Sequence, residues 1–206
     1  MKILINMATL KMGGGQNVGL NFLKGLETLD YLQHEFFFVV AKDSLIHDYI
    51  SKKYTTDNYM IVSNNPYIRI IQEKIYVNKY IISKGINIIY TYFGFGNFNK
   101  KNIQVMGVAD SNLFYPEINF WSEYGVLKRI SKKIIDNYRL KGYKSANGLI
   151  FENIDMEKRY KFRMNGANRT TYIQPSILTF DNEEDFSQND IRNNPKGLFL
   201  CGWQLN

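Results

Sequence analysis

The chain has 206 residues, of which 45% are apolar and 22% are charged, and its formal net charge is +7. This length predicts one domain, or one domain with a short appendage, and the composition excludes a wholly disordered or collagen-like protein. The only cysteine is Cys201, which excludes an internal disulfide and a thiolate zinc site and favours a cytoplasmic protein.

The hydrophobic segments are short. None approaches the roughly 20 consecutive apolar residues of a membrane-spanning helix. The N-terminal run over residues 3–10 is interrupted by Asn6 and has no small-residue cleavage site before the glycines that follow. It therefore predicts a strand and not a signal peptide.

The first half of the chain predicts three strands and three helices. Residues 3–7 are a strand that leads through three glycines into a helix, and residues 35–41 and 59–63 are the next two strands. The second helix has Asp43 and Ser44 as candidate caps, and the third begins at Asn65 and Pro66. The third helix ends near Gly85 and carries an isoleucine stripe at Ile68, Ile71, Ile75 and Ile82.

The second half continues the alternation. Residues 86–92, 103–108 and 149–151 predict strands, because each is a short, mostly apolar run, and residues 170–174 are expected to form a further strand that ends at Pro175. A basic helix ends near Ser145, and Asp155 is the candidate cap of a helix that stops at residues 165–166. Residues 179–195 are acidic and poor in apolar side chains, so they predict a linker.

This alternation predicts an α/β fold: a Rossmann-like parallel sheet of about seven strands with helices on both faces. We expect a domain over residues 1–178, the linker over 179–195, and the first strand of a second domain over 196–206. The chain would then be a fragment. Ligands of such sheets bind beyond the carboxyl ends of the strands, so the candidate loops are residues 10–15, 93–97, 109–116 and 152–154.

Positive charge is concentrated in residues 122–163, where eleven basic and five acidic side chains leave a net +6. Within this segment Val126, Ile130 and Ile134 recur every four residues, which predicts an amphipathic helix. Two interpretations remain open: a core helix with a solvated charged face, or a helix lying on anionic lipid headgroups. In the second case the membrane-facing residues are Lys128, Arg129, Lys132 and Lys133; we expect no nucleic-acid partner.

Several short motifs resemble one family. KILIN at residues 2–6, the glycines, and NVGLNFL at 17–23 resemble the start of the family 4 glycosyltransferases. YFGFGNF at 92–98, GVAD at 107–110, YPE at 115–117 and FEN at 151–153 are similar to a bacterial branch that builds surface polysaccharide. FLCG at 199–202 resembles the first strand of that family's donor-binding domain.

The resemblance implies the N-terminal, acceptor-side half of a GT-B fold, in which two Rossmann-like domains face each other across a cleft. It implies a metal-independent transferase without a cofactor, which moves a sugar from a nucleotide sugar to a cell-surface polysaccharide or lipid-linked acceptor at the inner membrane face. This domain alone would be inactive. Two positions depart from the family: Ala109 stands where many members carry histidine, and residues 175–177 only partly keep a Pro-Asn-Gly motif.

The glycine-rich loops are the first candidate binding elements. Gly13, Gly14 and Gly15 precede a helix whose free N–H groups can hold the donor diphosphate; the alternative is a tight turn for helix packing. Phe93, Gly94 and Phe95 follow the fourth strand, where a ring can stack on a sugar or lipid-linked acceptor; the alternative is core packing.

Polar residues after the fifth and sixth strands are the candidate reactive groups. Asp110 can accept the proton of the acceptor hydroxyl, or simply order its loop. Glu152 and Asn153 can bind sugar hydroxyls, or cap the following helix. His34 and His47 have no partners at metal-ligand spacing, so we expect no metal site.

Two other functions fit part of the pattern. An NAD(P)-dependent oxidoreductase is suggested by Gly13-x-Gly15, although Val18 occupies the third glycine position of the dinucleotide fingerprint. A non-enzymatic module that binds through the basic helix is the third possibility.

Overall fold

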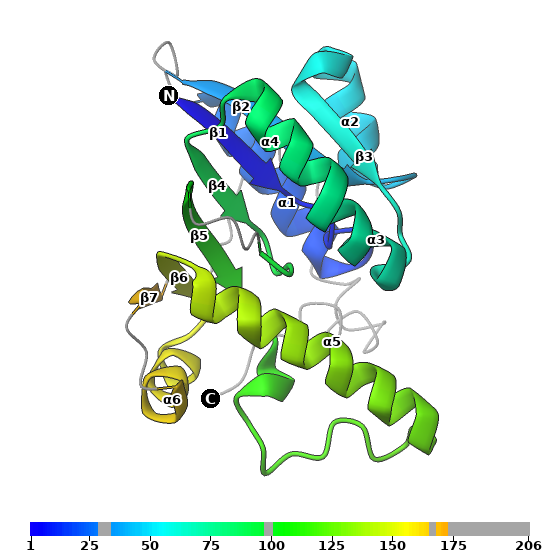
Figure 1. The fold of residues 1–206 in the computed structure, drawn as a ribbon, viewed down its shortest axis with the longest axis vertical. Coiled ribbons are helices and arrows are strands. Elements are labelled where there is room, and N and C mark those ends of the chain that lie inside the picture. The colour runs from blue at the N-terminus through cyan, green and yellow to red at the C-terminus, as the bar shows by residue number, and fades with distance from the viewer. Residues whose placement is uncertain (29–33, 97–100, 165–167, 173–206) are drawn as a thin grey trace, which may run out of the picture.

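The structure is a computed structural model that describes residues 1–28, 34–96, 101–164 and 168–172 (Figure 1). The expected linker, the expected last strand and Cys201 lie outside these residues. Seven strands form one sheet in the order β3-β2-β1-β4-β5-β6-β7, and every neighbouring pair is parallel. The predicted Rossmann-like α/β class is confirmed. The strands are β1 (Lys2–Asn6), β2 (Glu35–Ala41), β3 (Tyr59–Val62), β4 (Ile88–Thr91), β5 (Ile103–Val108), β6 (Gly148–Phe151) and β7 (Arg169–Tyr172).

Helices connect the strands. They are α1 (Gly14–Thr28), α2 (Leu45–Lys53), α3 (Pro66–Gln72), α4 (Asn78–Lys84), α5 (Val126–Ser145) and α6 (Ile154–Met164). A π-helical turn, η2 (Glu73–Val77), joins α3 to α4, so the predicted long third helix contains a π segment. Short 3₁₀ turns are η1 (Thr56–Asn58) and η3 (Ser111–Leu113).

Local side chains set several helix ends. Ser44 caps α2 by accepting a hydrogen bond from the N–H of His47 at 3.1 Å, and Asn65 caps α3 in the same way ahead of Pro66. Gly85 ends α4 with φ of +64°, a conformation that glycine adopts without strain. The cap of α6 is not Asp155 but Asn153, whose Oδ1 accepts from the N–H of Met156 at 2.8 Å.

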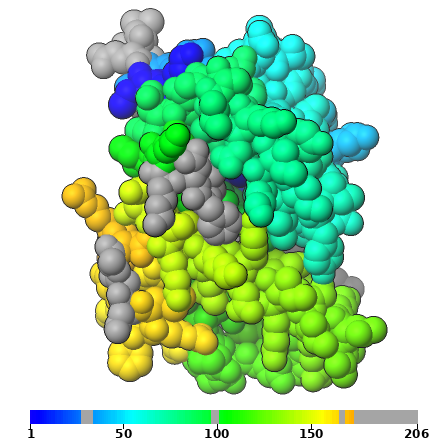
Figure 2. Space-filling view, in the orientation of Figure 1, coloured from blue at the N-terminus to red at the C-terminus, as the bar shows by residue number. Residues whose placement is uncertain are grey.

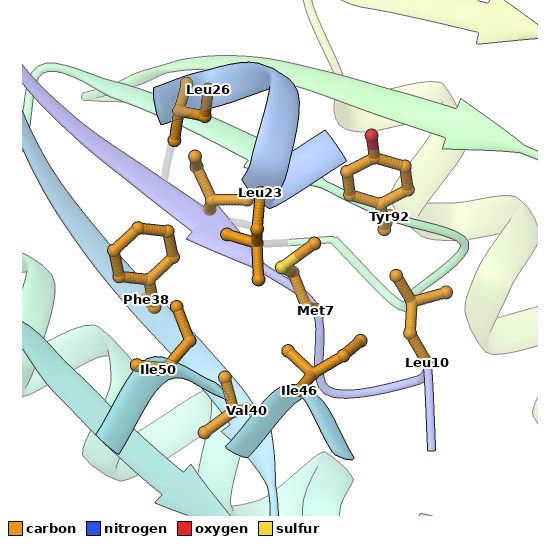
Figure 3. Close-up of a cluster of buried hydrophobic side chains, with 10 residues drawn as sticks. Met7, Leu10, Leu23, Leu26, Phe38, Val40, Ile46, Ile50 and Tyr92 are labelled. Carbon is orange, nitrogen blue, oxygen red and sulfur yellow. The ribbon is translucent and has the colours of Figure 1, made fainter. Parts of the chain in front are cut away.

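The sheet buries side chains on both faces, because successive residues of a strand point to opposite sides. On one face, side chains of β1 and β2 such as Ile5 and Phe38 pack against Leu23 of α1 and Ile50 of α2 (Figure 3). Leu4 and Phe37 point to the other face, where they pack against Val77 and Ile81. A third core joins β5 and β6 to α5 and α6. Figure 1 shows α4 and α5 in front of the sheet and α1 behind it.

The isoleucine stripe of the third predicted helix faces solvent. Ile68 and Ile71 are 49% and 57% exposed, and Ile75 and Ile82 are exposed as well. The side of the helix that faces the sheet instead carries Arg69, Glu73, Val77 and Ile81, spaced four residues apart.

The basic helix α5 shows a similar arrangement. Val126, Ile130 and Ile134, the stripe expected to mark its amphipathic face, are exposed, and so is Leu127. The buried residues of α5 are Ile135, Gly142 and Tyr143, so the helix packs against the rest of the protein only from its middle onward. The interpretation of α5 as a core helix with a solvated charged face is therefore wrong for its N-terminal half. Within the described ranges, no helix is both long and apolar enough to span a bilayer.

Neighbouring isoleucines provide a test of this orientation. Replacing buried Ile81 by Ala should lower the free energy of unfolding by about 2–5 kcal/mol, because it leaves a cavity under α4. Replacing exposed Ile82 by Ala should change it by less than about 0.5 kcal/mol. Urea unfolding of both variants measures the difference, and equal effects would contradict the orientation described here.

Candidate functional site

The parallel sheet brings the four predicted loops to one edge. β1, β4, β5 and β6 are consecutive neighbours, and the loops containing Gly14, Phe93, Asp110 and Glu152 each follow the carboxyl end of one of them. Val108 and Phe151 pair in register, so Asp110 and Glu152 follow adjacent strand ends. This edge is where ligands of open α/β sheets bind.

The glycine loop leaves open space in front of α1. A Cβ added to Gly13 or Gly14 would meet no atom within 4 Å, whereas one on Gly15 would contact Leu10. Gly13 has φ of +62°, which turns the chain into the helix start at Gly14. The expectation that a phosphate group approaches this loop is compatible with this space and stays a prediction.

Positive charge lies close to the glycine loop. Lys11 donates from Nζ to the carbonyl oxygen of Asn64 at 2.8 Å, and the pKa of Lys11 is lowered by burial and by repulsion from Arg69. Arg69 itself donates to the carbonyl oxygen of Ala8 at 3.1 Å, so α3 is tied to the loop that follows β1. An anion bound against the glycines would therefore meet the helix N-terminus and Lys11, whereas Arg69 is buried behind the loop.

The two phenylalanines after β4 occupy different environments. Phe95 is 1% exposed, and the guanidinium groups of Arg69 and Arg139 lie 5.1 Å and 6.0 Å from the centre of its ring. Its ring is therefore unavailable for stacking on a sugar, and core packing describes it. Phe93 has φ of +44° and is partly exposed, with its ring over Gly107. Of the two rings, only Phe93 remains accessible to a ligand.

Buried charge surrounds Phe95. Arg69 and Glu73 form an ion pair at 3.7 Å with both side chains more than nine-tenths buried. Burial raises the pKa of the Glu73 carboxyl, against the opposing effect of Arg69. α5 closes over this region at Gly142, where an added Cβ would collide with the carbonyl oxygen of Phe95. Only glycine permits this approach, which brings Arg139 over the ring.

Asp110 is held by two partners on α5. Its Oδ1 pairs with Arg139 at 2.9 Å, and its Oδ2 accepts a hydrogen bond from the buried Tyr143 hydroxyl at 2.5 Å. Burial raises the pKa of Asp110, while Arg139 and Tyr143 act in the opposite direction. Asp136, which accepts from Asn112 at 2.9 Å, is a second carboxylate near Arg139. These contacts support the loop-ordering alternative for Asp110.

Glu152 lies beside this arrangement with a less satisfied carboxyl group. Its Oε2 is buried and has no hydrogen-bond partner among the described residues. Burial, followed by the negative charge of Asp110, raises the pKa of Glu152 to about 7. We refer to Asp110, Asp136, Arg139, Tyr143 and Glu152 as the strand-end cluster. Its two strand-end carboxyls have different environments, which is the usual origin of distinct acid and base roles.

The other predicted site residues lie outside this cluster. Asn153 serves as the α6 cap, and Gly94 packs beneath the loop, where an added Cβ would collide with the Thr91 side chain. Lys128, Arg129 and Lys133 are exposed on α5, and Lys132 lies over the Trp121 ring at 4.8 Å. Among the described residues, no three His, Cys, Asp or Glu side chains gather as a metal site would require.

The sequence did not single out four residues of the ion pairs and hydrogen bonds around Phe95 and Asp110. These residues are Arg69, Glu73, Arg139 and Tyr143. Arg69 and Glu73 stand four residues apart and share one helix face, a spacing that was available in the sequence. The isoleucines on the opposite face outweighed that signal, because a stripe of four isoleucines resembles a core face. Arg139 and Tyr143, also four apart, were hidden among many basic residues of α5.

Removing the cation of the cluster should destabilise the fold. Replacing Arg139 by Met leaves Asp110 without its ion-pair partner, and we expect the free energy of unfolding to fall by about 3 kcal/mol. The loss should be larger at pH 8 than at pH 5, because the unpaired carboxylate is disfavoured in the folded state when ionised. Lys141→Met, at an exposed position of the same helix, is the control and should behave like the original protein in urea unfolding at both pH values.

The raised pKa of Glu152 predicts a second pH dependence of the free energy of unfolding. Its folded pKa of about 7 lies above the ordinary value of 4.5, so the ionised form destabilises the fold and stability falls as pH rises from about 4.5 to 7. Glu152→Gln should remove this fall, by an amount on the order of 1–3 kcal/mol between pH 5 and pH 8. Unfolding free energies over this range measure it, with exposed Glu123→Gln as control. An unchanged slope in Glu152→Gln would show that this carboxyl ionises freely.

Comparison with known proteins adds no relative: the chain matches no family model, no curated protein and no solved structure. The case for a function therefore rests on the chemistry of the strand-end cluster.

Proposed function

We propose that the chain is the acceptor-side domain of a glycosyltransferase that moves a sugar from a nucleotide sugar to a saccharide or lipid-linked acceptor. The observation that carries this proposal is Glu152, a half-buried carboxyl with a pKa near 7 and an unpartnered oxygen at the ligand-binding edge of a parallel sheet. A carboxyl with such a pKa can exchange a proton at neutral pH, as a general base requires.

The reaction would use the two ends of this edge differently. Glu152 would accept the proton of the acceptor hydroxyl as its oxygen bonds to the anomeric carbon. The bond from that carbon to the diphosphate breaks, and the diphosphate leaves with the electron pair. Gly13–Gly15 and the start of α1, with Lys11 nearby, would stabilise the growing negative charge on the diphosphate.

Asp110 takes a positioning role in this scheme and not the role of base. Arg139 and Tyr143 hold both of its carboxylate oxygens, which leaves it poorly placed to accept another proton. Its negative charge contributes to the raised pKa of Glu152 and so helps to keep that group near its working range. Ala109 stands where the family that the chain resembles often carries histidine, and alanine cannot act as a base. Glu152 would supply the base that this position lacks.

An oxidoreductase is the main alternative, since one fold supports many reactions. The glycine loop does not favour dinucleotide binding, because Val18 occupies the third glycine position and its side chain is exposed. Titration with NADH, followed by its fluorescence, separates the two: a saturable signal would support the oxidoreductase, and no change is expected from the transferase.

The transferase proposal is tested with the full-length protein and a panel of nucleotide sugars. Calorimetry should detect binding of at least one donor, and release of its nucleoside diphosphate should depend on an acceptor saccharide. Glu152→Gln should lower kcat by about 10²–10⁴-fold with little change in the donor KM, and should remove the rise in rate near pH 7.

Glu123→Gln is the matched control, because it removes an exposed carboxyl away from the strand ends and should retain full activity. Absence of donor binding by the folded full-length protein would overturn the proposal. Donor turnover that Glu152→Gln leaves intact would retain the reaction but reject the assigned base.

A further inference from the structure

The exposed apolar side chains of α3 and α5 lie on one face of the molecule. Figure 1 shows the two helices on the same side of the sheet, and Figure 2 shows atoms of both segments on the face toward the viewer. The Tyr67 hydroxyl of α3 contacts the Ser131 hydroxyl of α5, so the helices meet at these residues. Ile71 is one helical turn after Tyr67, Ile134 is about one turn after Ser131, and Ile130 directly precedes Ser131, so these isoleucines lie near the contact. We call Ile68, Ile71, Val126, Leu127, Ile130 and Ile134 the isoleucine face.

Isolated exposed apolar residues are common on proteins, but a contiguous group calls for a partner. The members of the isoleucine face are each about half exposed or more, and Leu127 reaches 84%. Ile118 and Phe120 in the loop before α5 are exposed as well. The chain thus presents the apolar stripes of two neighbouring helices to solvent.

Cations surround this face. The exposed charged side chains of α3 to α4 and of the loop and first half of α5 are five bases and two acids, Glu117 and Glu123, and Glu117 is paired with Arg159 of α6. The five bases are Lys74, Lys79, Lys128, Arg129 and Lys133. The other acid of these helices near the face, Glu73, points into the interior and is paired with Arg69. The surface is therefore complementary to an anionic partner that also accepts apolar groups.

Aromatic rings at the edge of the face carry cations of their own. Trp121 and Tyr124 stack at 5.7 Å, and the ammonium groups of Lys128 and Lys132 lie over Tyr124 and Trp121 at 4.1 and 4.8 Å. Arg129 fixes the loop to α5 through the carbonyl oxygens of Ser122 and Tyr124. Tryptophan and tyrosine beside basic side chains are typical of the boundary between water and lipid.

We infer that the isoleucine face, with its surrounding cations, docks the protein on an anionic lipid bilayer. The apolar side chains would enter the upper acyl region while the lysines contact the headgroups. Nucleic acid is a poorer match, because its phosphate backbone attracts the cations but would leave the exposed isoleucines in water. This inference extends the basic patch of α5 to a second helix, and it holds or fails independently of sugar transfer.

Vesicle flotation with the 206-residue chain tests the inference. Vesicles of phosphatidylcholine mixed with phosphatidylglycerol should carry the protein, and vesicles of phosphatidylcholine alone should carry much less. Ile71→Glu combined with Ile130→Glu should weaken binding on the order of 100-fold, because two apolar groups are lost and two negative charges gained. Both positions are exposed, so the variant should retain the thermal unfolding curve of the original protein.

The matched control is Ile154→Glu combined with Phe162→Glu, which makes the same charge change at two exposed apolar positions of α6. It should retain most of the binding. For the cations, Lys74→Gln, Lys128→Gln and Lys133→Gln together should weaken binding roughly 100-fold, at about fivefold per charge. The control with Lys52, Lys144 and Lys158 changed to Gln should have a much smaller effect.

Three outcomes would overturn the inference. One is no binding of the folded protein to anionic vesicles. Another is equal weakening by the α6 control, which would show that net charge alone drives binding. The last is salt-dependent binding to random DNA without vesicle binding, which would assign the cations to nucleic acid.

Discussion

Two guanidinium groups in contact with the Phe95 ring are the constraint on which the arrangement of the helices depends. Arg69 comes from α3 and Arg139 from α5, and both are largely withdrawn from water. Guanidinium groups remain charged, so each requires a carboxylate within reach. Glu73 forms the ion pair with Arg69, and Asp110 forms the ion pair with Arg139. One aromatic ring thus joins two ion pairs that tie the sheet edge to the helices above it.

This constraint determines which sides of the helices face outward. Arg69 and Glu73 can pair beneath the helix only if their face points inward, and the π-helical turn keeps Val77 and Ile81 on that same face. The isoleucines on the other side are thereby left in solvent. On α5, Arg139 and Tyr143 point to Asp110, and the apolar stripe of the first half is left exposed in the same way. The buried polar network and the exposed apolar surface are two consequences of one packing.

The same packing gives the two carboxyl groups at the strand ends, Asp110 and Glu152, different surroundings. Asp110 lies where α5 supplies a cation and a hydroxyl, whereas Glu152 follows the next strand and receives burial without a partner for Oε2. Low polarity around a carboxyl favours its neutral form, and a neighbouring negative charge adds to this effect. Burial raises the pKa of both acids, but only Asp110 has a cation and a hydroxyl that oppose this effect.

The sequence alone was sufficient to predict the class of fold, the seven strands of the sheet and most of the helix ends. Alternating short apolar runs with glycine, proline and capping residues such as Ser44, Asn65 and Gly85 specify these features within a few residues of chain. It was also sufficient to locate Asp110 and Glu152, because parallel strands bring their carboxyl ends to one edge. Only the tertiary structure decided which helix faces are buried. The buried faces are set by contacts between Arg69, Phe95 and Arg139, which are far apart in the chain. A periodic stripe of isoleucines is a local pattern and carries no information about such distant contacts.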